Sequence, residues 1–294
     1  MPRARLTRRL ATCLALVTAA PVLGLAACTP SPPQGLPEGL SASIQQGRLD
    51  IEARRLVVRL ENDGEATVTV QRLEVDSPSL ASGMVRDEPF EVAPGDALQI
   101  RMELTASECD AGDDPTHLVA VVLLDVSTAG GSGTVSGELP ADDPFGTLAR
   151  VTGEACLADS VEQVATLTMP EHLRSTGSGA DRRAFIDVEV VPAASGTGSF
   201  TIDRVYGTTL LNAEDGVDWP LGAEVAAGDE PFTISLPVRP ARCDAHAIAD
   251  DKRGTILPFA IRTSDGREGR LDRSSGDTLK SELYAYYGER CALQ

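Results

Sequence analysis

The chain has 294 residues, with 26 basic and 44 acidic side chains and a net charge of −18 at pH 7. A surface this acidic is repelled by the phosphates of nucleic acids, so we exclude nucleic acid as a partner. Anionic lipid headgroups repel this surface as well, so the protein surface alone is not expected to attach the chain to a membrane.

The first 27 residues have the order of a signal peptide. Four arginines precede an apolar run over residues 10–27, which is too short and too rich in alanine to span a membrane comfortably. The run ends in Leu25, Ala26, Ala27 and Cys28, which resemble the lipobox of bacterial lipoproteins. The resemblance implies that Cys28 is acylated, that residues 1–27 are removed, and that the acyl chains on Cys28 hold the protein on the extracytoplasmic face of the bacterial cell membrane.

Residues 28–39 are rich in proline and predict a tether that does not fold by itself. Loss of residues 1–27 removes four arginines and no acids, so the mature chain carries a net charge of −22. The acyl chains, and not the protein surface, are therefore expected to bind the membrane.

Four short segments recur in the same order about 133 residues apart. The pairs are TVQRLEV (69–75) with TIDRVYG (201–207), EVAPGD (91–96) with EVAAGD (224–229), CDA (109–111) with CDA (243–245), and GEAC (153–156) with GERC (288–291). Four matches in register indicate an internal repeat. We predict two tandem units, over residues 40–159 and 160–294.

Four of the six cysteines remain for the exported fold, because Cys13 leaves with the signal peptide and Cys28 takes the lipid. The repeat selects one of three pairings, since equivalent cysteines occupy equivalent places. We therefore predict two disulfides, Cys109–Cys156 and Cys243–Cys291. The cysteines lack CxxC spacing, which argues against a metal site built on them.

Short runs with alternating apolar residues predict strands in both units. In the first unit residues 56–60 and 68–75 predict a hairpin around a turn at 62–64, and later strands are predicted at 89–92, 98–104, 118–126 and, as an edge strand, 133–139. In the second unit strands are predicted at 185–191, 199–205, 231–238 and 255–261.

One short helix is expected in each unit. Leu279, Leu283 and Tyr286 recur at helical spacing before Gly288, the expected C-cap, and Phe145, Leu148 and Val151 recur before Gly153. The fold class is thus all-β, with two antiparallel β-sandwich units that each carry a disulfide. The pattern resembles immunoglobulin-like sandwiches, although the tryptophan that such domains carry between their cysteines is missing.

A search for catalytic motifs finds no nucleophile elbow, phosphate-binding loop or HExxH sequence. Three histidines, His117, His172 and His246, occupy different places in the two units. We predict no catalytic residue, no metal and no cofactor. Acidic loops at 111–115, 141–144 and 249–251 leave calcium as an open alternative.

Tyr284, Tyr286 and Tyr287 lie together near the C-terminus and predict a contact with a partner, because tyrosine favours interfaces. The leading hypothesis is a non-enzymatic envelope lipoprotein that binds or supports an envelope or membrane protein. A ligand-binding lipoprotein of a transporter or sensor is the alternative, and a hydrolase acting on the cell wall is a third.

Overall fold

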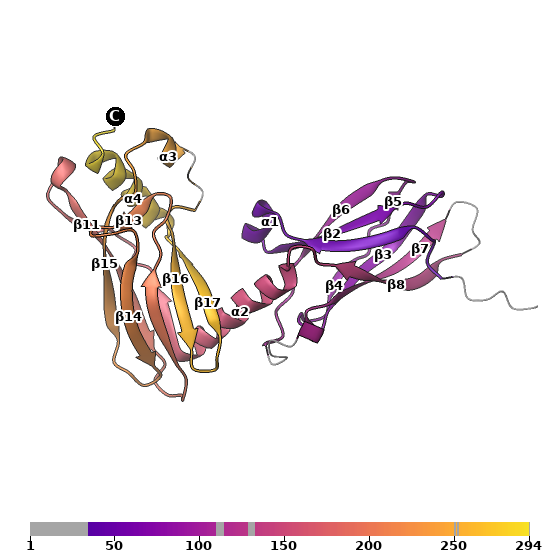
Figure 1. The fold of residues 1–294 in the computed structure, drawn as a ribbon, viewed down its shortest axis with the longest axis horizontal. Helices are drawn as coiled ribbons and strands as arrows, with labels where there is room; N and C mark the ends of the chain where they lie inside the picture. The colour runs from indigo at the N-terminus through magenta and orange to yellow at the C-terminus, as the bar shows by residue number, and fades with distance from the viewer. Residues whose placement is uncertain (1–34, 110–114, 129–132, 250, 252, 294) are drawn as a thin grey trace, which may run out of the picture. The chain divides into compact units, whose positions relative to one another are not determined.

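The computed structural model describes residues 35–109, 115–128, 133–249, 251 and 253–293 (Figure 1). Strands are the main regular structure of the described chain, so the predicted β class is confirmed. None of the helices among the described residues is long and apolar enough to cross a membrane. The predicted signal peptide (residues 1–27) and the predicted lipidation site, Cys28, lie outside the described residues.

The first half of the described chain forms one eight-stranded sheet, which we call the N-terminal sheet. The strand order is β4-β3-β7-β8-β1-β2-β6, and β5 also pairs with β3. The strands are β1 (Leu40–Gln45), β2 (Arg55–Asn62), β3 (Val68–Asp76), β4 (Met84–Arg86), β5 (Phe90–Val92), β6 (Ala97–Glu103), β7 (Ala120–Thr128) and β8 (Val135–Asp142). A short helix α1 (Arg48–Glu52) connects β1 to β2, and a 3-10 turn η2 (Pro115–His117) precedes β7.

Alternation of apolar and polar side chains builds the core of this sheet. On β7 every second residue is buried, including Val122 and Leu124, while the residues between them are half-buried on the outer face. Leu36 precedes the first strand and packs against the core of the sheet. A Cβ built on Gly137 would lie 2.5 Å from the Leu36 Cγ, so the Leu36 side chain fills the space next to this glycine. The end of the predicted tether is therefore part of the folded protein.

The second half forms two sheets that share one core, and we call it the C-terminal sandwich. One sheet has the order β10-β11-β15-β13, with β9 also on β11, and the other has the order β14-β12-β16-β17. The strands are β9 (Ala165–Thr168), β10 (Arg174–Thr176), β11 (Arg183–Pro192), β12 (Ser199–Val205), β13 (Leu211–Ala213), β14 (Trp219–Ala226), β15 (Phe232–Pro240), β16 (Ile256–Thr263) and β17 (Glu268–Ser274). The remaining elements are η3 (Gly179–Asp181), α3 (Ala245–Ala249) and α4 (Asp277–Arg290).

Helix α2 (Thr147–Val164) contributes to both cores. Its first turn is capped by Asp143, which accepts hydrogen bonds from the backbone N–H groups of Thr147 (2.7 Å) and Leu148 (2.8 Å). Leu148 is buried in the core of the N-terminal sheet, whereas Leu157 and Val161 are buried in the core of the C-terminal sandwich. The predicted boundary at 159/160 thus lies inside a continuous helix.

Corresponding strands of the two halves pair in the same way. Strands β3, β7 and β8 are neighbours in the N-terminal sheet, as β12, β16 and β17 are in the C-terminal sandwich, and β2 pairs with β6 as β11 pairs with β15. A bulge also recurs at the same place, between Val70 and Arg72 on β3 and between Ile202 and Arg204 on β12. These positions differ by the 132 residues that separate the first pair of repeated segments.

Two predictions about strand pairing are wrong. Strands β2 and β3 do not form a hairpin, because β2 pairs with β1 and β6, whereas β3 pairs with β4, β5 and β7. The predicted edge strand at 133–139 is β8, which lies inside the sheet between β7 and β1. The β1–β8 pair is parallel, so the N-terminal sheet is not purely antiparallel.

The predicted helix ends are also wrong. Gly153 and Gly288 lie within α2 and α4, because the backbone hydrogen bonding continues past both glycines. Phe145 precedes α2 and is 73% exposed, so it does not contribute to an apolar helix face.

Both predicted disulfides are present, and each ties a helix to the segment that follows a strand. Cys109 follows β6 and is bonded to Cys156 of α2, and Cys243 follows β15 and is bonded to Cys291 at the end of α4. The sequence separations are 47 and 48 residues. Disulfides of this kind are typical of proteins in oxidising compartments.

Replacing both Cys109 and Cys156 by alanine is expected to lower the free energy of unfolding by about 4 kcal/mol, the chain-entropy value for a loop of this length. Urea denaturation of the variant and the wild type measures the difference. Peptide mapping without reduction is the control on the pairing, and a link between Cys109 and Cys243 contradicts it.

Candidate functional site

The predicted tyrosine contact is wrong for two of its three residues. Tyr286 and Tyr287 are completely buried, and their hydroxyl groups donate hydrogen bonds to the backbone carbonyls of Val238 (2.7 Å) and Arg242. These side chains fasten α4 to β15 and to the segment that follows it, and they cannot meet a partner. Tyr284 is half-buried, and its hydroxyl donates to Asp251 at 2.8 Å. Burial and this hydrogen bond raise the pKa of Tyr284 to about 12.

Two acids of the predicted acidic loops already have structural roles. Asp143 caps helix α2, and Asp251 accepts hydrogen bonds from the Gly254 N–H and from Tyr284. Within the described ranges, no group of three or more His, Cys, Asp or Glu side chains is placed to hold a metal ion. The loop at 111–115 lies mostly outside those ranges.

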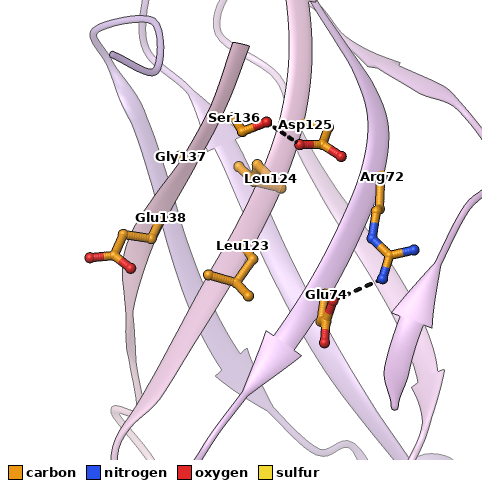
Figure 2. Close-up of a pocket in the computed structure, with 8 residues that line it drawn as sticks. All are labelled: Arg72, Glu74, Leu123, Leu124, Asp125, Ser136, Gly137 and Glu138. Atoms are coloured by element: carbon orange, nitrogen blue, oxygen red, sulfur yellow. Dashed lines mark hydrogen bonds and ion pairs between the residues drawn. The ribbon is translucent and has the colours of Figure 1, made fainter. Parts of the chain in front are cut away.

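The N-terminal sheet carries a surface hollow among its described residues. It lies on the outer face of β3, β7 and β8 and has a volume of about 480 Å³ (Figure 2). It is lined by Arg72, Glu74, Leu123, Leu124, Asp125, Ser136, Gly137 and Glu138.

Strand register arranges these side chains in rows across the three strands. In one row Arg72 is opposite Asp125, which is opposite Ser136. In the next row Leu123 lies between Glu74 and Glu138. Residues opposite each other in an antiparallel pair share a face, so an apolar side chain is flanked by two carboxylates.

A third row continues the same face beyond the hollow. Val121 lies between Asp76 and Pro140. Val121 and Leu123 are half-buried, while Asp76, Glu138 and Pro140 are exposed. We call the nine residues of the three rows the acidic face.

The charges of the acidic face are only partly compensated. Arg72 donates hydrogen bonds to Glu74 at 2.9 Å and to Asp87 at 2.7 Å, and these bonds raise the pKa of Arg72. Asp125 accepts a hydrogen bond from the Ser136 hydroxyl at 2.5 Å. No described residue forms an ion pair or hydrogen bond with the Glu138 carboxylate. The acidic face thus contains one arginine and four acids, so its net charge is negative.

The equivalent face of the C-terminal sandwich has different chemistry. It carries a hollow of about 370 Å³, lined by Asp203, Tyr206, Ala260, Ile261, Arg262, Glu268, Gly269 and Arg270. Arg262 donates to Asp203 at 2.8 Å and lowers the pKa of that carboxyl. Asp272 occupies the place of Glu138 and forms ion pairs with Arg253 and Arg270.

The comparisons with known proteins do not assign the chain to a family. No family model matches, and no curated protein matches. Among solved structures, a red sea bream transglutaminase is similar over 79% of this chain and 29% of its own chain, at 12% identity and a TM-score of 0.23. The YadV chaperone is similar over 76% and 94%, at 15% identity and a TM-score of 0.21. The chain spans less than a third of the transglutaminase, and TM-scores this low carry no argument about function.

The contrast between the two faces predicts opposite effects of adding a lysine. Glu138→Lys is expected to leave the thermal unfolding midpoint unchanged or to raise it, because it relieves repulsion among acids. Asp272→Lys is expected to lower the midpoint, because Arg253 and Arg270 lose their shared partner. Calorimetry in low and high salt measures both, with salt reducing each difference. A fall for Glu138→Lys equal to that for Asp272→Lys contradicts the charge assignment.

Of the three histidines, His172 contacts helix α4. Its Nδ1 lies 2.9 Å from Oε1 of Glu282. The other oxygen of that carboxylate, Oε2, accepts a 2.6 Å hydrogen bond from the Leu173 N–H. The bond to Glu282 raises the pKa of His172 above its ordinary value of 6.5.

This pair predicts a weak dependence of stability on pH. Its contribution is fully present below pH 6.5, the ordinary histidine value, and is lost as the pH rises through the raised pKa of the folded state. An NMR titration of His172 measures that pKa directly. Glu282→Gln is expected to return it toward 6.5, and an unchanged pKa in this variant would show that Glu282 is not the cause.

Proposed function

We propose that the chain is a lipid-anchored cell-envelope lipoprotein that acts as an extracytoplasmic protein-interaction or support module. The observation that carries the proposal is the lipobox-like Leu25–Cys28 at the end of a signal-peptide pattern, followed by a disulfide-bonded β fold. Two or three acyl chains hold a protein durably on a bilayer, at about 0.8 kcal/mol per buried methylene. The disulfides fit an oxidising exterior.

The short distance from the anchor to the fold supports a module that works close to the membrane. Leu36 already packs against the core, and it lies only eight positions after Cys28 in the sequence. A chain of this length reaches at most about 29 Å. The N-terminal sheet would thus stay within one small-domain diameter of the bilayer.

We further propose that the module consists of two tandem copies of one unit, over residues 40–159 and 160–294. The shared strand pairings, the bulge repeated after 132 residues and the equivalent disulfides support this. Leu157 belongs to the first repeat by its position in the sequence, but its side chain is buried in the core of the second unit. A stable β scaffold whose two equivalent faces differ in charge suits a binding role, since the hollows lie on open sheet faces.

Changing Cys28 to Ala is expected to abolish labelling of the protein by radioactive palmitate and to remove mature protein from the membrane fraction. Cys13→Ala is the matched control, because Cys13 leaves with the signal peptide, and it is expected to change neither result. Labelling that persists in Cys28→Ala would overturn the anchor.

In-cell crosslinking of the wild type, followed by mass spectrometry, tests the interaction role. The expected result is a specific envelope protein that is lost when the anchor is removed. Absence of any partner above background would overturn the module and leave the anchor standing.

A further inference from the structure

The acidic face combines features that are costly for a surface without a partner. Leu123 and Val121 lie in the centre of its rows, half-exposed to water, with acids on both sides of Leu123 and on one side of Val121. Nearby carboxylates repel one another, and such repulsion lowers the stability of a sheet. Apart from the Arg72–Glu74 ion pair and the hydrogen bond from Ser136 to Asp125, the folded state gains nothing from placing Glu74, Asp125 and Glu138 on one face.

The equivalent face shows that the fold does not require this arrangement. There Tyr206, Pro258 and Asp272 take the places of Glu74, Leu123 and Glu138, as the shared bulge and register align them. Asp272 is neutralised by two arginines, whereas the Glu138 carboxylate is free among the described residues. The uncompensated charge is thus specific to one copy.

We propose that the acidic face docks a basic segment of a partner protein, with an apolar side chain of that segment resting on Leu123 and Val121. The proposal rests on the interaction role proposed above and adds the surface and the chemistry of the partner. Charge complementarity selects this occupant, because one arginine, already bonded to Glu74 and Asp87, faces at least three carboxylates. A central apolar contact with a charged rim is the usual anatomy of an interface.

The geometry sets the spacing of the cations. Glu74 and Glu138 are on strands two positions apart, so their backbones are about 9.6 Å apart. Lysines at positions i and i+7 of a helix are about 10.5 Å apart, with the residues between them on the same face at i+3 and i+4. A helix of this pattern matches the row of Glu74, Leu123 and Glu138.

The test uses two helical peptides of equal charge, with lysines at i and i+7 and either leucine or glutamine at i+3 and i+4. Each is titrated into the mature, unacylated chain (residues 28–294, with Cys28→Ala), and chemical-shift changes are followed by NMR. The leucine peptide is expected to shift resonances of β3, β7 and β8, and to bind at least roughly tenfold more tightly than the glutamine peptide.

Variants of the chain locate the binding. Glu138→Lys and Leu123→Ser are each expected to weaken the leucine peptide roughly tenfold. Glu268→Lys tests the equivalent face, and Leu49→Ser replaces a leucine that is 75% exposed but lies elsewhere; both are expected to change the affinity less than about twofold.

Shifts spread over the whole surface, equal binding of the two peptides, or full binding to Glu138→Lys would each overturn the inference. The failure is distinct from failure of the proposed function. If in-cell crosslinking captures a partner equally well with wild type and Glu138→Lys, the module stands and the acidic face is not its docking site.

Discussion

Both hydrophobic cores depend on the apolar side chains of helix α2. Leu148 near its start is buried under the N-terminal sheet, and Leu157, Val161 and Val164 are buried in the C-terminal sandwich. The Asp143 cap holds the first turn, and the Cys109–Cys156 disulfide fastens the middle of the helix. Because both ends of α2 carry buried apolar side chains, fraying at either end would expose apolar surface to water.

Local sequence pattern predicts the strands well, because alternation is visible over a few residues. Strand β12 has the predicted bounds, 199–205, and the two disulfides follow from the repeat alone. Pairing was harder to predict, since it depends on distant segments. Strand β6 pairs with β2 from 36 to 48 residues away in the sequence, and no local signal in β2 and β3 excludes the expected hairpin.

The candidate site depends on the same long-range pairing. Glu74, Leu123 and Glu138 come from three separate strands, and only register shows that they form a row. The sequence held one usable signal, the arginine shared by the repeated segments at 69–75 and 201–207. The tyrosines misled because composition does not indicate the direction of a side chain. Tyr286 and Tyr287 face the core of α4's own unit, where backbone carbonyls satisfy their hydroxyl groups.

The packing of Leu36 beneath the position of Gly137 has a mechanical consequence. A pull exerted through Cys28 would reach the fold at Leu36 and pass into β1, which is bonded to β2 on one side and to β8 on the other. For a pull directed along β1, the bonds of both ladders would resist together and not one after another. Tension from the proposed anchor would in that case load the fold in shear, the direction in which a β-strand is hardest to extract.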